Sequence, residues 1–111
     1  MSVKETDKID AIGVEESTNT LVLLVSDPFQ WKIQEYEHLK AFQTKINNYV
    51  HFIESGQYRT KYPDRSFDGF RIEAVFKYRW SDAGESFFSA GKKQLAERGI
   101  DFSYKLKEVQ Q

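Results

Sequence analysis

The sequence has no cysteine among its 111 residues, so it can form neither disulfides nor thiolate metal sites. It has only two prolines and six glycines, which is too few for a Pro/Gly-rich disordered chain. No apolar run approaches the roughly 20 residues that a membrane-spanning helix needs. The first residues also lack the basic-then-apolar order of a signal peptide. These absences predict a cytoplasmic protein without membrane contact.

Aromatic side chains and charge are abundant. Apolar residues make up 40% of the chain and aromatic residues 15%, enough for one core without covalent staples. The net charge is −1, but residues 1–37 carry three basic against eight acidic residues, and residues 38–111 carry thirteen against nine. Such a division favours steered encounters with charged partners, or it is ordinary solubilising surface charge.

Periodicity predicts two helices and four strands. Strands at 9–14 and 21–25 form a hairpin, and a third strand at 70–80 alternates apolar and polar residues. A long amphipathic helix follows the hairpin, with Asp27 as its N-cap, Pro28 as its first residue and Gly56 closing it. We place Lys45 on its solvated side. A second helix is capped by Asp82, approaches the sheet at Gly91 and ends at Gly99 before a last strand at 100–107.

The element order β-β-α-β-α-β predicts an α+β fold, a two-layer sandwich. Two helical crossovers favour parallel pairing, whereas the hairpin is antiparallel, so the four-stranded sheet is mixed. Both alternating strands have one polar face, which places both helices on one face of the sheet. Residues 1–8 are expected to be a flexible N-terminus and residues 9–109 a single α+β domain.

The usual chemical motifs are missing. The histidines, His38 and His51, lie about 220° apart around the first helix and cannot share a metal. We expect each to form a surface pair, with Glu35 and Glu54 respectively. No phosphate loop, nucleophile elbow or metal spacing is present, and no carboxylate pair has a buried setting. The sequence therefore predicts no catalytic residue, no metal and no cofactor.

The segment 57–69 is long for a loop and is a candidate partner-binding surface. It carries residue types that are enriched in interface hot spots, namely Tyr58, Arg59, Tyr62, Arg65 and Phe67. The alternative is that its aromatic side chains cap the open end of the core. Phe29 and Trp31, before the first helix, form a smaller patch with the same two interpretations.

The polar face of the sheet is a second candidate surface. Its basic residues, which could contact phosphates, are Arg71, Lys77, Arg79, Lys105 and Lys107. The same face carries Glu73 and Asp101 and lacks the exposed aromatic pair that base stacking requires. Nucleic acid is therefore not the expected partner.

One stretch of the sequence resembles a known family. Residues Tyr49-Val50-His51-Phe52-Ile53-Glu54-Ser55-Gly56, with the following Tyr62-Pro63, are similar to a family of small bacterial proteins of unknown function. The similarity continues through Ile9-Asp10-Ala11-Ile12-Gly13 and Val75-Phe76-Lys77-Tyr78. The resemblance implies a bacterial cytoplasmic α+β protein and supplies no catalytic residues.

The resulting hypothesis is a non-enzymatic protein-binding module. By analogy with other small bacterial domains, it is an immunity protein that neutralises a cognate toxin domain by occlusion. The alternative is a regulatory or housekeeping module that binds RNA or a small ligand through the basic sheet face. A homodimer, formed through the sheet face or an edge strand, is compatible with either function.

Overall fold

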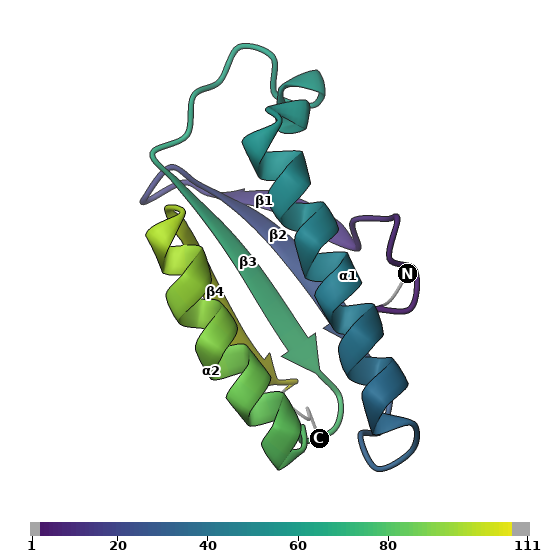
Figure 1. Ribbon diagram of the computed structural model, residues 1–111. Helices are drawn as coiled ribbons and strands as arrows, with labels where there is room; N and C mark the ends of the chain where they lie inside the picture. Colours follow the sequence, from purple (N-terminus) through teal and green to yellow (C-terminus); the bar gives the residue numbers. More distant parts are fainter. Residues whose placement is uncertain (1–2, 108–111) are drawn as a thin grey trace, which may run out of the picture.

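The computed structural model describes residues 3–107 and contains one four-stranded sheet and two long helices (Figure 1). The strands are β1 (Ala11–Glu15), β2 (Thr20–Asp27), β3 (Gly69–Phe76) and β4 (Ile100–Leu106). The helices are α1 (Glu35–Glu54) and α2 (Asp82–Glu97), and a short 3-10 helix, η1 (Gln57–Thr60), follows α1. This confirms the predicted α+β order and the mixed sheet.

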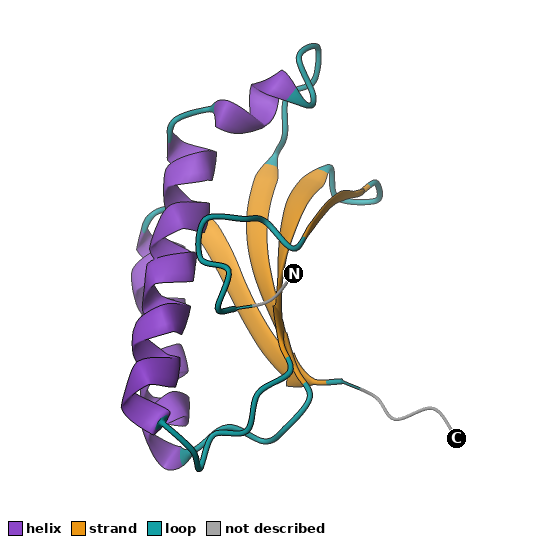
Figure 2. Ribbon diagram, turned by 90° about the vertical axis from the view of Figure 1, so that its right-hand side faces the viewer, coloured by secondary structure: helices purple, strands orange, loops and turns teal. Residues whose placement is uncertain are grey.

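The strands lie in the sheet in the order in which they occur in the chain. β1 pairs antiparallel with β2, while β2 with β3 and β3 with β4 are parallel. Both helices cover the same face of the sheet, and the other face is open (Figure 2). The core between the layers is largely aromatic; Phe42 of α1, for example, stacks on Phe76 of β3 with ring centroids 5.6 Å apart.

The first helix starts later than predicted. Asp27 is the last residue of β2 rather than an N-cap, and residues 28–34 are irregular. The N-cap is Gln34, which has a left-handed backbone (φ 56) and makes no side-chain capping bond. The carboxylate of Asp27 is engaged elsewhere, because it accepts hydrogen bonds from the backbone N–H of Phe29 and from His38. It therefore closes the turn after β2 instead of capping a helix.

The face of α1 that meets the sheet contains two polar side chains, which corrects two expectations. His38 is buried rather than paired with Glu35 on the surface, and Lys45 has no exposed area. Both lie at helical spacing with the buried Phe42 and Tyr49. His51 does stay on the surface, but Glu54 pairs with Arg98 of the α2 C-cap rather than with it. The buried stripe of α1 is thus interrupted by two nitrogen groups that need acceptors.

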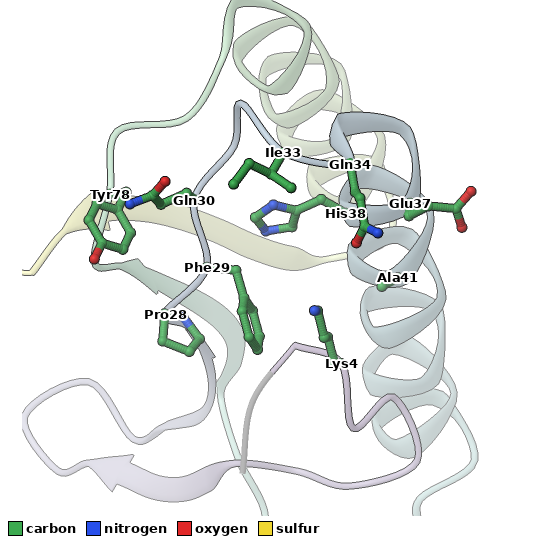
Figure 3. A pocket seen from close by; sticks show the side chains of 10 residues that line it. All are labelled: Lys4, Pro28, Phe29, Gln30, Ile33, Gln34, Glu37, His38, Ala41 and Tyr78. Atoms are coloured by element: carbon green, nitrogen blue, oxygen red, sulfur yellow. The ribbon is translucent and has the colours of Figure 1, made fainter.

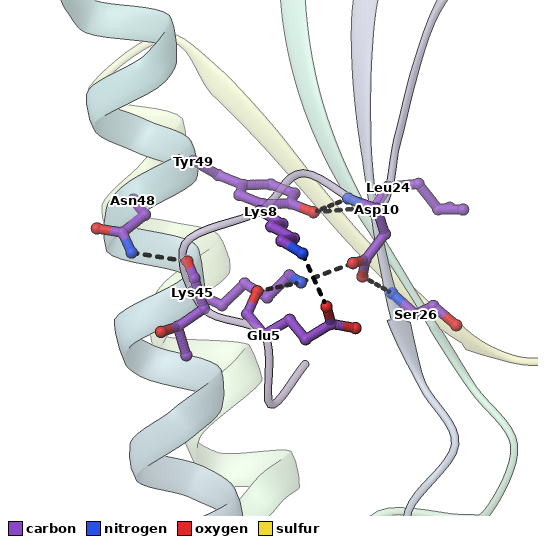
Figure 4. A network of polar contacts seen from close by, with 9 residues as sticks. Glu5, Lys8, Asp10, Leu24, Ser26, Lys45, Asn48 and Tyr49 are labelled. Atoms are coloured by element: carbon purple, nitrogen blue, oxygen red, sulfur yellow. Dashed lines mark hydrogen bonds and ion pairs between the residues drawn. The ribbon is translucent and has the colours of Figure 1, made fainter. Parts of the chain in front are cut away.

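The ammonium of Lys45 is held by a network at the start of β1 (Figure 4). Its Nζ lies 2.7 Å from Oδ1 of Asp10 and donates to the carbonyl of Glu5. The other oxygen of Asp10 accepts from the backbone N–H of Ser26 in β2. The Tyr49 hydroxyl donates to the Leu24 carbonyl at 2.6 Å, and burial raises the pKa of this hydroxyl. One network therefore joins α1, β1 and β2.

The chain before β1 lies against the domain. Val3 is buried, and its N–H donates to the carbonyl of Ser26. The carbonyl of Thr6 accepts from the side chain of Asn48 on α1. The flexibility expected for residues 1–8 stays a prediction, as does the domain boundary at residue 109, which lies outside the described residues.

The second half of the chain differs from the prediction in three details. β3 ends at Phe76 rather than at residue 80, because its neighbour β2 ends at the paired Asp27 and Pro28 has no N–H for the ladder. The N-cap of α2 is Ser81, whose hydroxyl accepts from the N–H of Gly84. The glycine that meets close neighbours is Gly84, because a Cβ there would lie 3.2 Å from Trp80, whereas a Cβ at Gly91 would meet nothing within 4 Å.

Replacing Asp10 by Ala is expected to destabilise the fold by about 3–5 kcal/mol, because the buried Lys45 ammonium loses its carboxylate partner. Urea unfolding followed by circular dichroism measures the change. The matched control is Asp7→Ala, which removes an exposed carboxylate of the same segment and should change stability by less than about 0.5 kcal/mol. Equal effects of the two substitutions would contradict the role given to the network.

The two α2 glycines should respond oppositely to alanine. Gly91→Ala is expected to stabilise the protein by about 0.5–1 kcal/mol, because it removes backbone entropy from a helix interior where space is open. Gly84→Ala should destabilise it by about 1–3 kcal/mol through crowding against Trp80 and Trp31. Thermal unfolding of both variants measures these changes. A stabilising Gly84→Ala would show that Trp80 and Trp31 can move to accommodate the added methyl group.

Candidate functional site

A cavity of about 480 Å³ lies where β2 leads into α1. Its walls come from the irregular segment 28–34, the first turns of α1, Lys4 of the N-terminal segment and Tyr78 after β3 (Figure 3). We call it the β2–α1 cavity. The carboxyl ends of parallel strands are the usual place for binding sites in sheets with helical crossovers. The volume is in the range of small-molecule and side-chain pockets.

One lining residue of the cavity, His38, forms a buried carboxylate–imidazole pair with Asp27. Nε2 of His38 lies 2.6 Å from Oδ2 of Asp27, and both side chains are almost completely buried. The indole of Trp31 stacks on the imidazole, with ring centroids 3.7 Å apart and an interplanar angle of 17°. Phe29 approaches the same ring edge-on. The imidazole of His38 is therefore fixed in orientation by a hydrogen bond and by two aromatic contacts.

The second nitrogen of this ring is available. Nδ1 of His38 has no hydrogen-bond partner within residues 3–107. Solvent reaches this atom, because the one fully buried polar side-chain atom without a partner in that range is Nε1 of Trp31. His38 lines the cavity, with its ring between Ile33 and Phe29 (Figure 3). In the tautomer whose Nε2–H donates to the Asp27 carboxylate, the lone pair of the ring is on Nδ1. The cavity thus contains one rigidly held acceptor.

Exposed apolar side chains gather at the same end of the sheet. Among the described residues, the large apolar side chains with substantial exposure are Ile33 (66%), Tyr36 (72%), Tyr78 (37%) and Leu106 (39%). Leu106 is paired with Phe76, and Phe76 with Asp27, at the carboxyl ends of the parallel strands. Ile33 and Tyr78 line the cavity, and Tyr36 lies in the first turn of α1. We call these four residues the carboxyl-end surface.

The charges around the cavity are mixed. The ammonium of Lys4 lies over the ring of Phe29, 4.2 Å from its centroid, and has no carboxylate partner in the described part of the chain. Glu37 is the acidic residue of the lining, beside the amides of Gln30 and Gln34. No serine or threonine lines the cavity. The arrangement offers binding groups, and the hydroxyl in its lining is the phenol of Tyr78.

The predicted loop residues lie at the opposite end of the sheet, beyond the amino end of β3. Tyr58 is buried, and its ring packs on Phe67 and Phe70 with centroids 5.8 and 5.3 Å apart. Tyr62 packs edge-on against Phe67. Three of the five predicted residues thus contact one another, as the core-capping alternative expects. A partner at this loop stays a prediction.

The two arginines of the loop are placed differently. Both terminal nitrogens of Arg65 bind the carboxylate of Glu16, at 3.0 and 2.9 Å, and this bond lowers the pKa of Glu16. Arg59 is exposed, and its guanidinium lies over the ring of Tyr58. Arg65 therefore fastens the loop to the β1–β2 turn, which leaves Arg59 as the more available of the two.

The basic residues predicted for the sheet face do not form one patch. Arg71 binds Glu15 and Lys105 lies 3.0 Å from Glu73, so both cations on the open face have carboxylate partners. The others lie beyond the strand ends, where Lys77 and Arg79 stand over the rings of their own neighbours and Lys107 follows β4. Arg71 and Lys105 on the open face are thus neutralised by carboxylates of the same sheet.

Two further findings concern the described residues as a whole. No helix within residues 3–107 is long and apolar enough to cross a membrane. No group of three or more histidine and acidic side chains in that range could hold a metal ion.

Fold and site define a class: a two-layer α+β protein with one helical face, one open sheet face and a cavity at the carboxyl end. The chain belongs to the family of unknown function DUF6572, which matches residues 1–108. This agrees with the resemblance in one respect, that the family is one of unknown function. No curated protein and no solved structure matches the chain.

The pairing of Asp27 with His38 differs from what the sequence pattern predicts for either residue. Asp27 before Pro28 has the pattern of a helix cap, and a histidine with a glutamate three residues before it has the pattern of a surface pair. A signal was nevertheless present, because His38 lies four residues before Phe42 and therefore on the apolar stripe. Phe29 and Trp31, the smaller predicted patch, do belong to the surroundings of the cavity.

Replacing Arg71 by Gln should raise the pKa of Glu15. The Arg71 guanidinium holds the pKa of this carboxyl below its ordinary value of 4.5 by a hydrogen bond and by charge. A carboxylate with a lowered pKa stabilises the folded state above the ordinary pKa, and this contribution is lost as the pH falls through the lowered value. Carbon-detected NMR titration of the glutamate carboxyls measures the shift. Glu16 is the internal control, since its partner is Arg65, and an unchanged Glu15 would contradict the assignment.

Proposed function

We propose that this protein is a non-enzymatic binding module whose contact site is the carboxyl-end surface together with the β2–α1 cavity. One observation carries the proposal: the exposed large apolar side chains of the described chain all lie at one end of the sheet. Contiguous exposed apolar side chains beside a cavity are typical of interaction sites in soluble proteins. The site differs from the loop that the sequence favoured, because the loop aromatics contact one another and the core.

The partner that suits this surface is another protein. Tyrosine and isoleucine side chains around a recess, with lysine and glutamine at its rim, resemble an interface with an apolar centre and a polar border. In the finer form of the proposal, the protein is a bacterial cytoplasmic immunity protein that covers the active site of a cognate toxin. The absence of cysteine suits that reducing compartment.

The RNA-binding alternative has no supporting observation on the open sheet face. Phosphate binding depends on protein cations that displace the counterions of the nucleic acid, whereas Arg71 and Lys105 already have carboxylate partners.

The test uses the full chain and the protein encoded by the adjacent gene, mixed as purified components. Ile33→Ser and Tyr36→Ser should each weaken the complex at least about tenfold in calorimetric titration, because each removes an exposed apolar contact. Both side chains are exposed, so unfolding curves should stay close to that of the wild type.

Arg59→Ala in the loop is the matched control. Unchanged affinity for this variant, with loss for the other two, supports the carboxyl-end surface. The reverse pattern would restore the loop at residues 57–69 as the contact site. If no complex forms, the proposal that the adjacent gene encodes the toxin partner is wrong.

A further inference from the structure

We infer that the β2–α1 cavity receives a tryptophan or tyrosine side chain of the partner protein, which donates a hydrogen bond to Nδ1 of His38. The inference rests on the proposed function and names the chemistry that the same site recognises. It follows from the fixed acceptor, from the shape and polarity of the walls and from the charge already present.

The acceptor is the first element. Nδ1 has no partner among residues 3–107 and belongs to a side chain that lines the cavity, while Nε2 is bound to Asp27 and the ring is stacked on Trp31. Because the ring cannot turn without breaking that bond and that stack, its lone pair has one direction. A fixed acceptor in an apolar recess discriminates strongly, since an occupant that cannot donate leaves it unpaired.

The walls are the second element. Phe29, Ile33, Pro28 and Tyr78 surround the space and present rings and aliphatic carbon. Aromatic rings pack on such walls by edge and face contacts, and tyrosine and tryptophan combine a large apolar body with a single donor. A cavity of about 480 Å³ has room for either side chain.

Charge excludes the competing donors. Lysine and arginine side chains also donate, but the ammonium of Lys4 already lies over Phe29 inside the lining. A second cation in the same recess would be repelled by it, and the carboxylate of Glu37, the acidic residue of the lining, points away from the His38 ring (Figure 3). A neutral ring with one N–H or O–H group remains as the occupant.

Paired probes test the donor directly. Indole and 1-methylindole have nearly the same shape, but only indole can donate. In an amide NMR titration of the full chain, both should shift the signals of Phe29, Gln34 and Ala41. Indole should bind roughly three- to tenfold more tightly, the factor expected for one hydrogen bond. Equal affinities, or binding without shifts at these residues, would overturn the inference.

Two substitutions separate the cavity nitrogen from its structural partner. His38→Gln keeps a donor near the position of Nε2, toward Asp27, and removes the cavity acceptor, so it should lose the preference for indole. His38→Asn places an oxygen near the position of Nδ1 and should retain it. If neither variant folds, Ala41→Phe fills the cavity without touching the pair and should abolish binding of both probes. A preference for indole that survives His38→Gln, or binding that survives Ala41→Phe, would refute the assignment.

A third probe establishes whether the occupant is part of a protein. N-acetyl-tryptophan amide should bind at least as tightly as indole, because its peptide groups can reach the amides of Gln30 and Gln34 at the rim. If indole binds and this probe does not, the occupant is a free small molecule, and the inference of a protein side chain is wrong. These readouts are independent of the Ile33 and Tyr36 variants, so the inference and the proposed function can fail separately.

Discussion

The position of α1 on the sheet depends on two buried side chains, an ammonium and an imidazole, that each bind a carboxylate. Lys45 and His38 lie on the buried stripe of the helix, and each reaches an aspartate at an end of a strand: Asp10 before β1 and Asp27 at the end of β2. An apolar stripe alone would let the helix slide by a turn at small cost, since many registers bury similar area. Two charge-assisted bonds seven residues apart permit only one register. The register of α1 also fixes the position of the irregular segment 28–34 and of the cavity that this segment lines.

The two ends of the sheet have consequently different surfaces. At the amino end of β3, the rings of Tyr58, Tyr62 and Phe67 pack on one another, and Arg65 ties their loop to the β1–β2 turn. At the carboxyl end, apolar side chains remain exposed around a recess whose floor is rigid. A rigid floor with an exposed apolar rim favours binding, because few side chains have to be ordered when a partner binds and the entropy cost is therefore small.

Much of the architecture was predictable because it depends on patterns that repeat along the chain. The alternation from Phe70 to Phe76 and the helical spacing of Phe42 and Tyr49 led to the correct order, sheet type and layering. The site was not predictable, because it depends on exceptions to those patterns. Asp27 before Pro28 has the sequence of a helix cap, and only the fold shows that its carboxylate meets His38 eleven residues later. Lys45 looked solvated because a buried lysine is rare without a partner, and its partner lies 35 residues away.

The spatial order of the strands, identical to their order in the chain, has a consequence for how the molecule assembles. The β1–β2 hairpin closes over a short turn, but Thr20 of β2 meets Gly69 of β3 only after 48 intervening residues. Loop closure of that length is slow, so the hairpin and α1 can form before β3 docks. Each later strand then adds to an existing edge, without displacing anything. A chain emerging from a ribosome can therefore build this sheet from one side to the other as it is made, with β4 completing it last.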